Sequence, residues 1–191
     1  MIIPCVLYIA WDIFFTAKGV WWFNEDYVTG IKIINLPVEE VLFFLIVPYC
    51  CLFIYECVRC YFPKLKNKKL VDVMFKILAA VLFISGIFFY NRYYTSWTFI
   101  LNAVFIAGLY VFKKKISTFD ATSFLVGYGI MLLPFLIVNG FLTAIPVVLY
   151  NDAENLGFRI YTIPFEDIFY GMLLVLMIVV LYEKLKSRSM L

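Results

Sequence analysis

Residues 36–60 read LPVEEVLFFLIVPYCCLFIYECVRC, in which a proline and two adjacent carboxylates precede a long apolar run. Proline fits the first turn of a helix, because the N–H that it lacks has no partner there. The stretch from Val38 to Val58 has about the length of roughly 20 residues that a helix needs to cross a bilayer. Lipid offers no partner to backbone polar groups, so a transmembrane helix is expected here.

Five further apolar stretches occur along the 191-residue chain, in which 65% of residues are hydrophobic and 15% are charged. Soluble domains carry about 45–50% apolar and about 25% charged residues, and small ones still expose much of their surface. Lipid must therefore be the solvent, and the sequence predicts an all-α, polytopic membrane bundle of about six transmembrane helices. The approximate spans are Ile2 to Thr16, Val38 to Val58, Leu70 to Tyr90, Ser96 to Phe112, Thr122 to Tyr150 (with a bend at Pro134) and Phe165 to Tyr182.

The basic residues predict the orientation, because cytoplasmic loops carry an excess of Lys and Arg. Of the 16 basic residues, twelve fall in one alternating set of loops and four in the other. The larger set is expected in the cytoplasm with the C-terminus, and residues 15–36, 91–95 and 151–163 are expected outside a bacterial inner membrane. The larger set is Arg59, Lys64, Lys66, Lys68, Lys69, Lys76, Lys113, Lys114, Lys115, Lys184, Lys186 and Arg188.

An internal repeat is the strongest signal of organisation. Residues 12–56 align without a gap on residues 139–183, a shift of 127 positions. Polar residues match as well as apolar ones, which the composition of two apolar helices does not explain. The aligned helices are four spans apart, which predicts a parallel repeat about an axis along the membrane normal. The chain is then a single membrane domain, 1–191, with repeat one at 1–60, linking helices at 61–121 and repeat two at 122–191. Matched pairs include Asn24/Asn151, Gly30/Gly157, Pro37/Pro164, Glu39/Glu166, Glu40/Asp167 and Glu56/Glu183.

Two carboxylates follow the proline in each copy, in NLPVEE (residues 35–40) and TIPFED (residues 162–167). Acidic residues at a helix N-terminus can simply cap free N–H groups and complement the helix dipole. A functional role is favoured because one carboxylate suffices for a cap and neighbouring side chains point about 100° apart. Ionisable groups that begin an apolar span are also costly. The catalytic candidates are Glu39, Glu40, Glu166 and Asp167.

The absence of histidine leaves acid–base chemistry to the 13 Asp and Glu residues, ahead of Tyr and Lys. Burial keeps a carboxyl protonated, which makes it a general acid, and aromatic faces stabilise a nearby cation. An interfacial aromatic belt explains the nearby rings equally well. Acid beside such rings suits protonation of an alkene in a lipid-soluble substrate. The candidate substrate-binding rings are Trp21, Phe43, Phe44, Phe165, Phe169 and Tyr170.

The stretch Trp11-Asp12 to Thr16, Gly19-Val20-Trp21, Phe23-Asn24, Gly30 and Leu36-Pro37-Val38-Glu39-Glu40 resembles the lycopene cyclase domain of the small membrane-integral type. That type occurs as two-subunit bacterial cyclases, as fungal fusions with phytoene synthase and as single chains. Residues 151–167 look like the second half of the same fused domain. The resemblance covers nearly the whole chain.

This resemblance implies a non-redox isomerase, an intramolecular lyase, that closes the linear ends of lycopene into β-ionone rings. A carboxylic acid protonates the terminal double bond, the chain closes onto the cation, and a base removes a ring proton. By matching position, Glu39, Glu40, Glu166 and Asp167 would carry the proton transfer. No cofactor is expected, and no G-x-G-x-x-G occurs. Cys57 and Cys60 form a CxxC without a second pair or a histidine, so no metal is expected.

Two features depart from the family pattern. Single-chain members usually have one more helix before the Trp-Asp helix. Two explanations are open: the sequence lacks its first helix, or the protein requires a partner. The second copy has Asn139 where the first has Asp12, and Val148 where the first has Trp21, so the copies are unequal. The expected partners are a lipophilic polyene substrate, membrane lipid, and a second copy or other carotenoid enzymes, with no nucleic acid.

Other classes of function compete with the cyclase. The main alternative is a transporter of a small or lipophilic substrate, which a parallel repeat favours but the few polar residues in the spans do not. A prenyltransferase needs Asp-rich magnesium motifs, and a purely structural protein leaves the repeat unexplained.

The repeat also predicts the geometry of the site. The second and sixth spans are expected to pack face to face, with Glu39 opposite Glu166 and Glu40 opposite Asp167 at one membrane depth. Glu56 and Glu183 lie about 17 residues further on, so they are expected to be solvated at the cytoplasmic surface.

Overall fold

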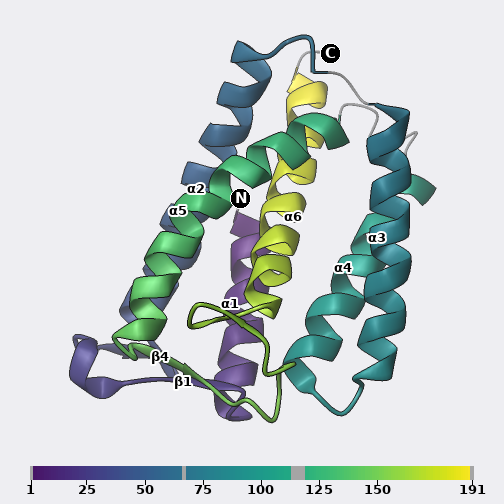
Figure 1. Ribbon diagram of the computed structural model, residues 1–191. Helices are drawn as coiled ribbons and strands as arrows, with labels where there is room; N and C mark the ends of the chain where they lie inside the picture. The colour runs from purple at the N-terminus through teal and green to yellow at the C-terminus, as the bar shows by residue number, and fades with distance from the viewer. Residues whose placement is uncertain (1, 66–67, 113–118, 190–191) are drawn as a thin grey trace.

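The computed structural model describes residues 2–65, 68–112 and 119–189. In this part of the chain, helices form an elongated bundle (Figure 1). Five of them are long and apolar enough to cross a membrane, and α1 is a shorter apolar helix. The predicted all-α membrane bundle is therefore confirmed. The helices are α1 (Ile2–Ala17), α2 (Val38–Tyr61), α3 (Lys69–Phe88), α4 (Tyr93–Val111), α5 (Ala121–Ala144) and α6 (Glu166–Ser189).

The fifth helix is shorter than predicted. It ends at Ala144, and residues 148–150 form a strand instead of continuing the expected span to Tyr150. Pro146 explains the stop, because proline removes a backbone donor and disfavours helical geometry at the preceding residue. Pro37 lies one position earlier than expected, as the extended N-cap residue of α2.

Short strands, which the sequence analysis did not predict, lie at the end of the bundle where α2 and α6 begin. β1 (Trp21–Phe23) pairs antiparallel with β4 (Val148–Tyr150), and Trp22 stands opposite Leu149. Trp22 and Leu149 are 127 positions apart, so the pairing is symmetric about them. Two tight hairpins complete this end: β2 (Lys32–Ile33) with β3 (Leu36–Pro37), and β5 (Arg159–Ile160) with β6 (Ile163–Pro164).

Positions 127 residues apart also form the same hydrogen bonds around these strands. Asn24 N–H donates to Val147 O, and Asn151 N–H donates to Val20 O, each at 2.9 Å. The two segments therefore have closely similar local structure and contact each other reciprocally. Further equivalent pairs are Val38 N–H to Ile31 O with Phe165 N–H to Phe158 O, the ion pairs Glu25–Lys32 and Asp152–Arg159, and the positive φ angles of Gly30 and Gly157.

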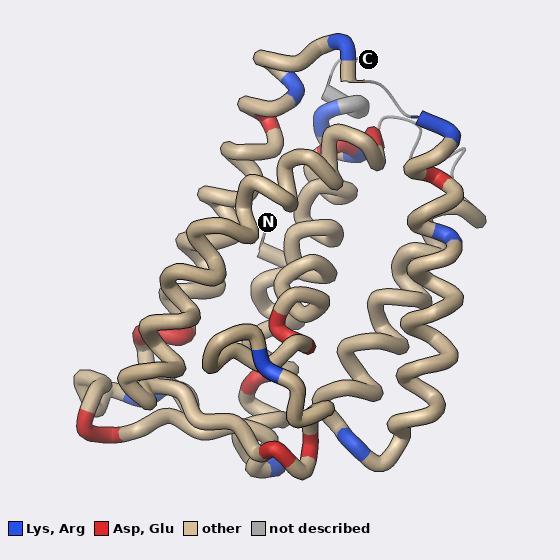
Figure 2. The backbone as a smooth tube through the Cα atoms, in the orientation of Figure 1, with Lys and Arg blue, Asp and Glu red and all other residues tan. Residues whose placement is uncertain are grey.

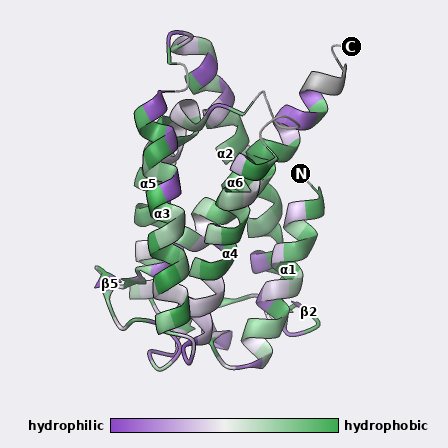
Figure 3. Ribbon diagram, turned by 90° about the vertical axis from the view of Figure 1, so that its right-hand side faces the viewer, coloured by the Kyte–Doolittle hydropathy of each residue, from purple (hydrophilic) through white to green (hydrophobic). Residues whose placement is uncertain are grey.

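The bundle packs around α6. α2 contacts both α5 and α6, while α3 and α4 form a hairpin whose α4 packs on α6. Buried apolar side chains from α2 to α6 form the largest core cluster. The outer surface is also strongly apolar (Figure 3), with Ile84 68% and Leu133 68% exposed, as expected where lipid is the solvent.

Charged residues gather at the two ends of the bundle (Figure 2). The last turns of α2 and α6 lie at one end, and the strands lie at the other (Figure 1). Lys66 and Lys113–Lys115, which the charge pattern predicts in the cytoplasm, lie outside the described residues.

The expectation that Glu183 is solvated was wrong. Its side chain is buried and forms an ion pair with Arg59, while Glu56 pairs with Lys186 at 2.7 Å. The packing of α2 against α6 explains the burial, because it places Glu183 against the facing helix, which supplies Arg59 as a counter-ion.

The orientation can be tested with single cysteines in a background that lacks the five native cysteines. Because positive loops face the cytoplasm, an impermeant thiol reagent added outside intact cells is expected to label position 154 and not position 64. After the cells are opened, both positions should react. Labelling of position 64 alone in intact cells would reverse the orientation.

Candidate active site

Glu39 and Glu166 hold the loops that precede their helices. Glu39 Oε1 accepts the N–H of Thr29 at 2.7 Å, and Glu166 Oε1 accepts the N–H of Leu156 at 2.7 Å. Thr29 and Leu156 are again 127 positions apart. Glu166 is fully buried and also accepts the hydroxyl of Thr95 at 2.5 Å. Neither glutamate lines the cavity that contains the second carboxylates of the two motifs.

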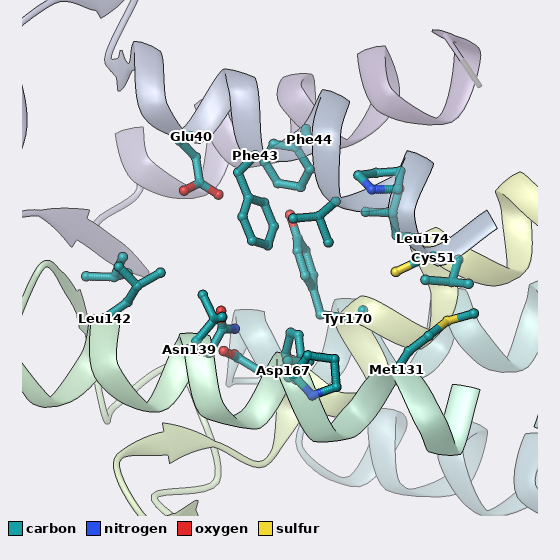
Figure 4. Close-up of a pocket in the computed structure, with 18 of the residues that line it drawn as sticks. Glu40, Phe43, Phe44, Cys51, Met131, Asn139, Leu142, Asp167, Tyr170 and Leu174 are labelled. Atoms are coloured by element: carbon teal, nitrogen blue, oxygen red, sulfur yellow. The ribbon is translucent and has the colours of Figure 1, made fainter. Parts of the chain in front are cut away.

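Glu40 and Asp167, the second carboxylates of the two motifs, line one cavity of about 260 Å³. Figure 4 shows both side chains, together with Asn139, toward one end of it. Asp12, on α1, lines the same cavity. The structure thus brings Glu40 and Asp167 together across α2 and α6 but leaves Glu39 and Glu166 outside. Within the described residues, no cluster of three or more His, Cys, Asp or Glu side chains could hold a metal ion.

Asp167 accepts a hydrogen bond on each carboxylate oxygen. The Tyr94 hydroxyl donates to Oδ1 at 2.5 Å, and the Tyr150 hydroxyl donates to Oδ2 at 2.9 Å. Burial raises the pKa of Tyr150 well above its ordinary value, so this phenol keeps its proton and remains a donor. Hydrogen bonds of this kind stabilise the ionised form of a carboxylate.

Glu40 has different surroundings, although it occupies the matching position. Among the described residues, no side chain or backbone group forms a hydrogen bond with its carboxyl. The position that matches Tyr150 is Phe23, which also lines the cavity but has no hydroxyl to donate. A carboxyl in an apolar cavity without donors favours its neutral, protonated form.

Asp12 is a cavity residue that the sequence analysis did not select. It is 1% exposed, and its Oδ1 accepts the indole N–H of Trp21 at 2.5 Å, while its Oδ2 accepts no hydrogen bond from the residues that the structure describes. The signal that could have identified it is the mismatch with Asn139, because both residues line the cavity. Trp21 and its aligned residue Val148 differ in the same way, so the carboxylate and its donor occur together.

Four of the six predicted rings line the cavity: Trp21, Phe43, Phe44 and Tyr170. Trp21 packs against Tyr170 with ring centroids 5.8 Å apart, next to Tyr94 and Tyr150. Phe165 and Phe169 do not line it and instead pack on each other, with centroids 5.3 Å apart.

The cavity continues as an apolar groove between α2 and α5. Its lining residues on α2 recur every three or four positions from Glu40 to Ile54, which corresponds to about 21 Å along a helix. Cys50 and Val138 line it from the two helices and are exposed, so the groove opens to the outer surface of the bundle.

The fold and the cavity define a class: a membrane helix bundle that places acidic side chains at one end of an apolar, ring-lined groove. The family description for lycopene cyclase matches residues 1–58 and 91–185, and the chain belongs to this family. A bifunctional lycopene cyclase/phytoene synthase from Aspergillus niger is 36% identical over 56 residues, a match that covers 27% of this chain and 10% of that protein. No solved structure matches significantly.

The two loop-binding glutamates should differ in their effect on stability. Glu166→Ala is expected to lower the free energy of unfolding by on the order of 2–4 kcal/mol, because it leaves a backbone N–H and a buried hydroxyl without their acceptor. Glu39→Ala removes one hydrogen bond near the surface and is expected to cost about 1 kcal/mol. Unfolding of the purified proteins in detergent measures both, and equal losses would contradict the comparison.

Proposed function

We propose that this chain is a carotenoid cyclase that forms β-ionone rings on the linear ends of a lycopene-type substrate by acid-initiated, non-redox cyclisation. One observation carries the proposal: Glu40 and Asp167 line the same apolar cavity, but within the described part of the chain only Asp167 of the two accepts hydrogen bonds. An acid and a base are thereby provided by two equivalent positions. Family membership and the fungal relative support the substrate class.

Glu40 acts as the general acid. Without a hydrogen-bond donor in an apolar cavity its carboxyl carries a proton, and an acid of this kind can protonate an alkene. The proton goes to the terminal double bond of the substrate, and the positive charge forms on the adjacent carbon. The electron pair of a neighbouring double bond then forms the ring C–C bond and moves the charge into the ring.

The aromatic rings and Asp12 stabilise the cation. Phe43, Phe44 and Tyr170 line the cavity next to the carboxylates, and the negative faces of such rings attract a cation. Asp12, held by Trp21, is a fixed countercharge in a site from which water is largely excluded. Preorganised charges of this kind act on charge that develops during a reaction.

Asp167 acts as the base. It removes a proton next to the cationic carbon, and the electron pair of the broken C–H bond forms the ring double bond. Glu40 has then lost one proton and Asp167 has gained one, so the substrate is isomerised without an oxidant or reductant. Transfer of the proton from Asp167 back to Glu40 restores both carboxyl groups. Glu39 and Glu166 support this pair by holding the adjoining loops.

The groove between α2 and α5 accommodates the polyene chain. Its length of about 21 Å and its opening at Cys50 and Val138 allow a long rigid substrate to enter from the bilayer, end group first. The protein is then a multi-pass protein of the bacterial inner membrane with its C-terminus in the cytoplasm. A second copy of the chain, or the enzymes that make its substrate, are the partners that this location favours.

Expression in a bacterium that makes lycopene tests the function directly, with pigments separated by liquid chromatography. The unaltered chain is expected to yield cyclic product, and Glu40→Gln or Asp167→Asn should lower the yield by about 10²–10⁴-fold with normal amounts of folded protein. Glu25→Gln, at the same end of the molecule but exposed, is the matched control and should retain activity. Absence of cyclic product from the unaltered chain would reject the cyclase and favour a transporter.

A hydrogen-bond donor introduced next to Glu40 should weaken its function as the general acid. Phe23→Tyr adds a hydroxyl at the position that matches Tyr150, where it can donate to Glu40 and stabilise the carboxylate. The yield is expected to fall by on the order of tenfold, while Trp22→Tyr, on the opposite face of β1, should have no effect. Full activity of Phe23→Tyr would show that the lack of a hydrogen-bond donor is not what keeps Glu40 protonated.

A further inference from the structure

We propose that Tyr94 and Tyr150, by fixing both oxygens of Asp167, select the C–H bond that is broken in the last step and thereby determine which ring isomer is released. This inference rests on the proposed function but assigns a specificity role that cyclisation alone does not require.

The choice arises from the chemistry of the ring cation. Three kinds of C–H bond flank its charged carbon: one on the ring carbon that bears the polyene, one on a ring methylene and one on a methyl group. Loss of the first proton gives a ring double bond conjugated with the polyene, loss of the second gives an unconjugated ring double bond, and loss of the third gives an exocyclic double bond. All three products have the same mass. Because a base must lie within hydrogen-bond reach of the proton that it removes, its position decides the product.

The structure fixes the carboxylate of Asp167 from two independent elements. Tyr94 comes from α4, and Tyr150 comes from β4. The two rings are stacked, with centroids 6.0 Å apart and an interplanar angle of 16°. Rotation of the carboxylate would break both hydrogen bonds at once, so its oxygens have one preferred orientation toward the cavity.

The positions of the tyrosines are themselves determined by the fold. Tyr150 stands opposite Trp21 in the β1–β4 pair, and Tyr94 is 1% exposed, with its N–H donated to Glu154 O at 2.9 Å. Trp21 packs edge-on against Tyr94, with centroids 5.1 Å apart. Neither hydroxyl can follow a rotating carboxylate without disturbing this cluster.

Within the described residues, no such pair of hydrogen bonds fixes the carboxyl of Glu40, the proposed acid. Glu40 protonates a carbon at the end of the substrate, where the alternatives among neighbouring protons do not arise, and Phe23 replaces the tyrosine there. Two hydrogen bonds therefore restrain the base, and none restrains the acid, as selection among C–H bonds requires. A single donor would be enough to keep the base ionised, so the second tyrosine needs this additional explanation.

The experiment compares ring isomers made by Tyr94→Phe and Tyr150→Phe in a lycopene-making bacterium. Each variant is expected to lower the ratio of the main isomer to the others by on the order of tenfold, because one restraint on the carboxylate is lost. Chromatography separates the isomers, and a shorter absorption wavelength identifies those with a shorter conjugated system. Tyr110→Phe is the matched control, since Tyr110 is also on α4 and donates to a carboxylate, that of Asp72, outside the cavity. It should leave the ratio unchanged.

The outcomes separate this inference from the proposed function. Absence of cyclic product from the unaltered chain would reject the function itself. An unchanged isomer ratio in both variants, or loss of all cyclic product from folded protein, would reject selection and leave the tyrosines as supports of the base. If either variant does not fold, Asp167→Glu decides, because it keeps both donors and moves the carboxylate by one methylene. A single unchanged isomer from that variant would overturn the proposal.

Discussion

The pairing of β1 with β4 determines the arrangement of the site. Alternate side chains of a strand point to the same face, so Trp21, Phe23, Val148 and Tyr150 all face the cavity, while Trp22 faces away and is 45% exposed. This three-residue ladder places the donor for Asp12 and a donor for Asp167. It also joins the segment that follows α1 to the segment that follows α5.

Lipid imposes the second constraint: backbone polar groups must find hydrogen-bond partners within the protein, because the hydrocarbon layer contains no water to bind them. The structure meets this constraint in part with Glu39 and Glu166, which bind the N–H groups of Thr29 and Leu156 and so keep the irregular loops in a defined shape at the end of the bundle. The first carboxylate of each pair therefore binds a backbone N–H of the preceding loop and not one of its own helix. The second is free to face the cavity, since the side chains diverge by about 100°.

The sequence predicted the helices, because hydropathy is a local signal, and its matched polar residues singled out Glu40 and Asp167, which line one cavity. It could not distinguish Glu39 from Glu40, since the direction of each side chain depends on the loop that Glu39 binds. It also did not predict the strands, which are only two or three residues long and form between distant segments. Tyr94 lies in a linking helix outside the repeat, so no alignment of the two copies could have placed it next to Asp167.

The differences between the two matched segments follow from the chemistry proposed for the site. A symmetric pair of carboxyls in equivalent surroundings would compete for the same protonation state, and neither would be fixed as acid or base. The matched positions diverge at the places that break this equivalence. Tyr150 gives Asp167 a donor where Phe23 gives Glu40 none, and Trp21 supports Asp12 where Val148 faces the neutral Asn139. In the proposed mechanism, two segments of similar local structure hold two carboxylates at one cavity, and a few side chains from the strands give these carboxylates opposite roles.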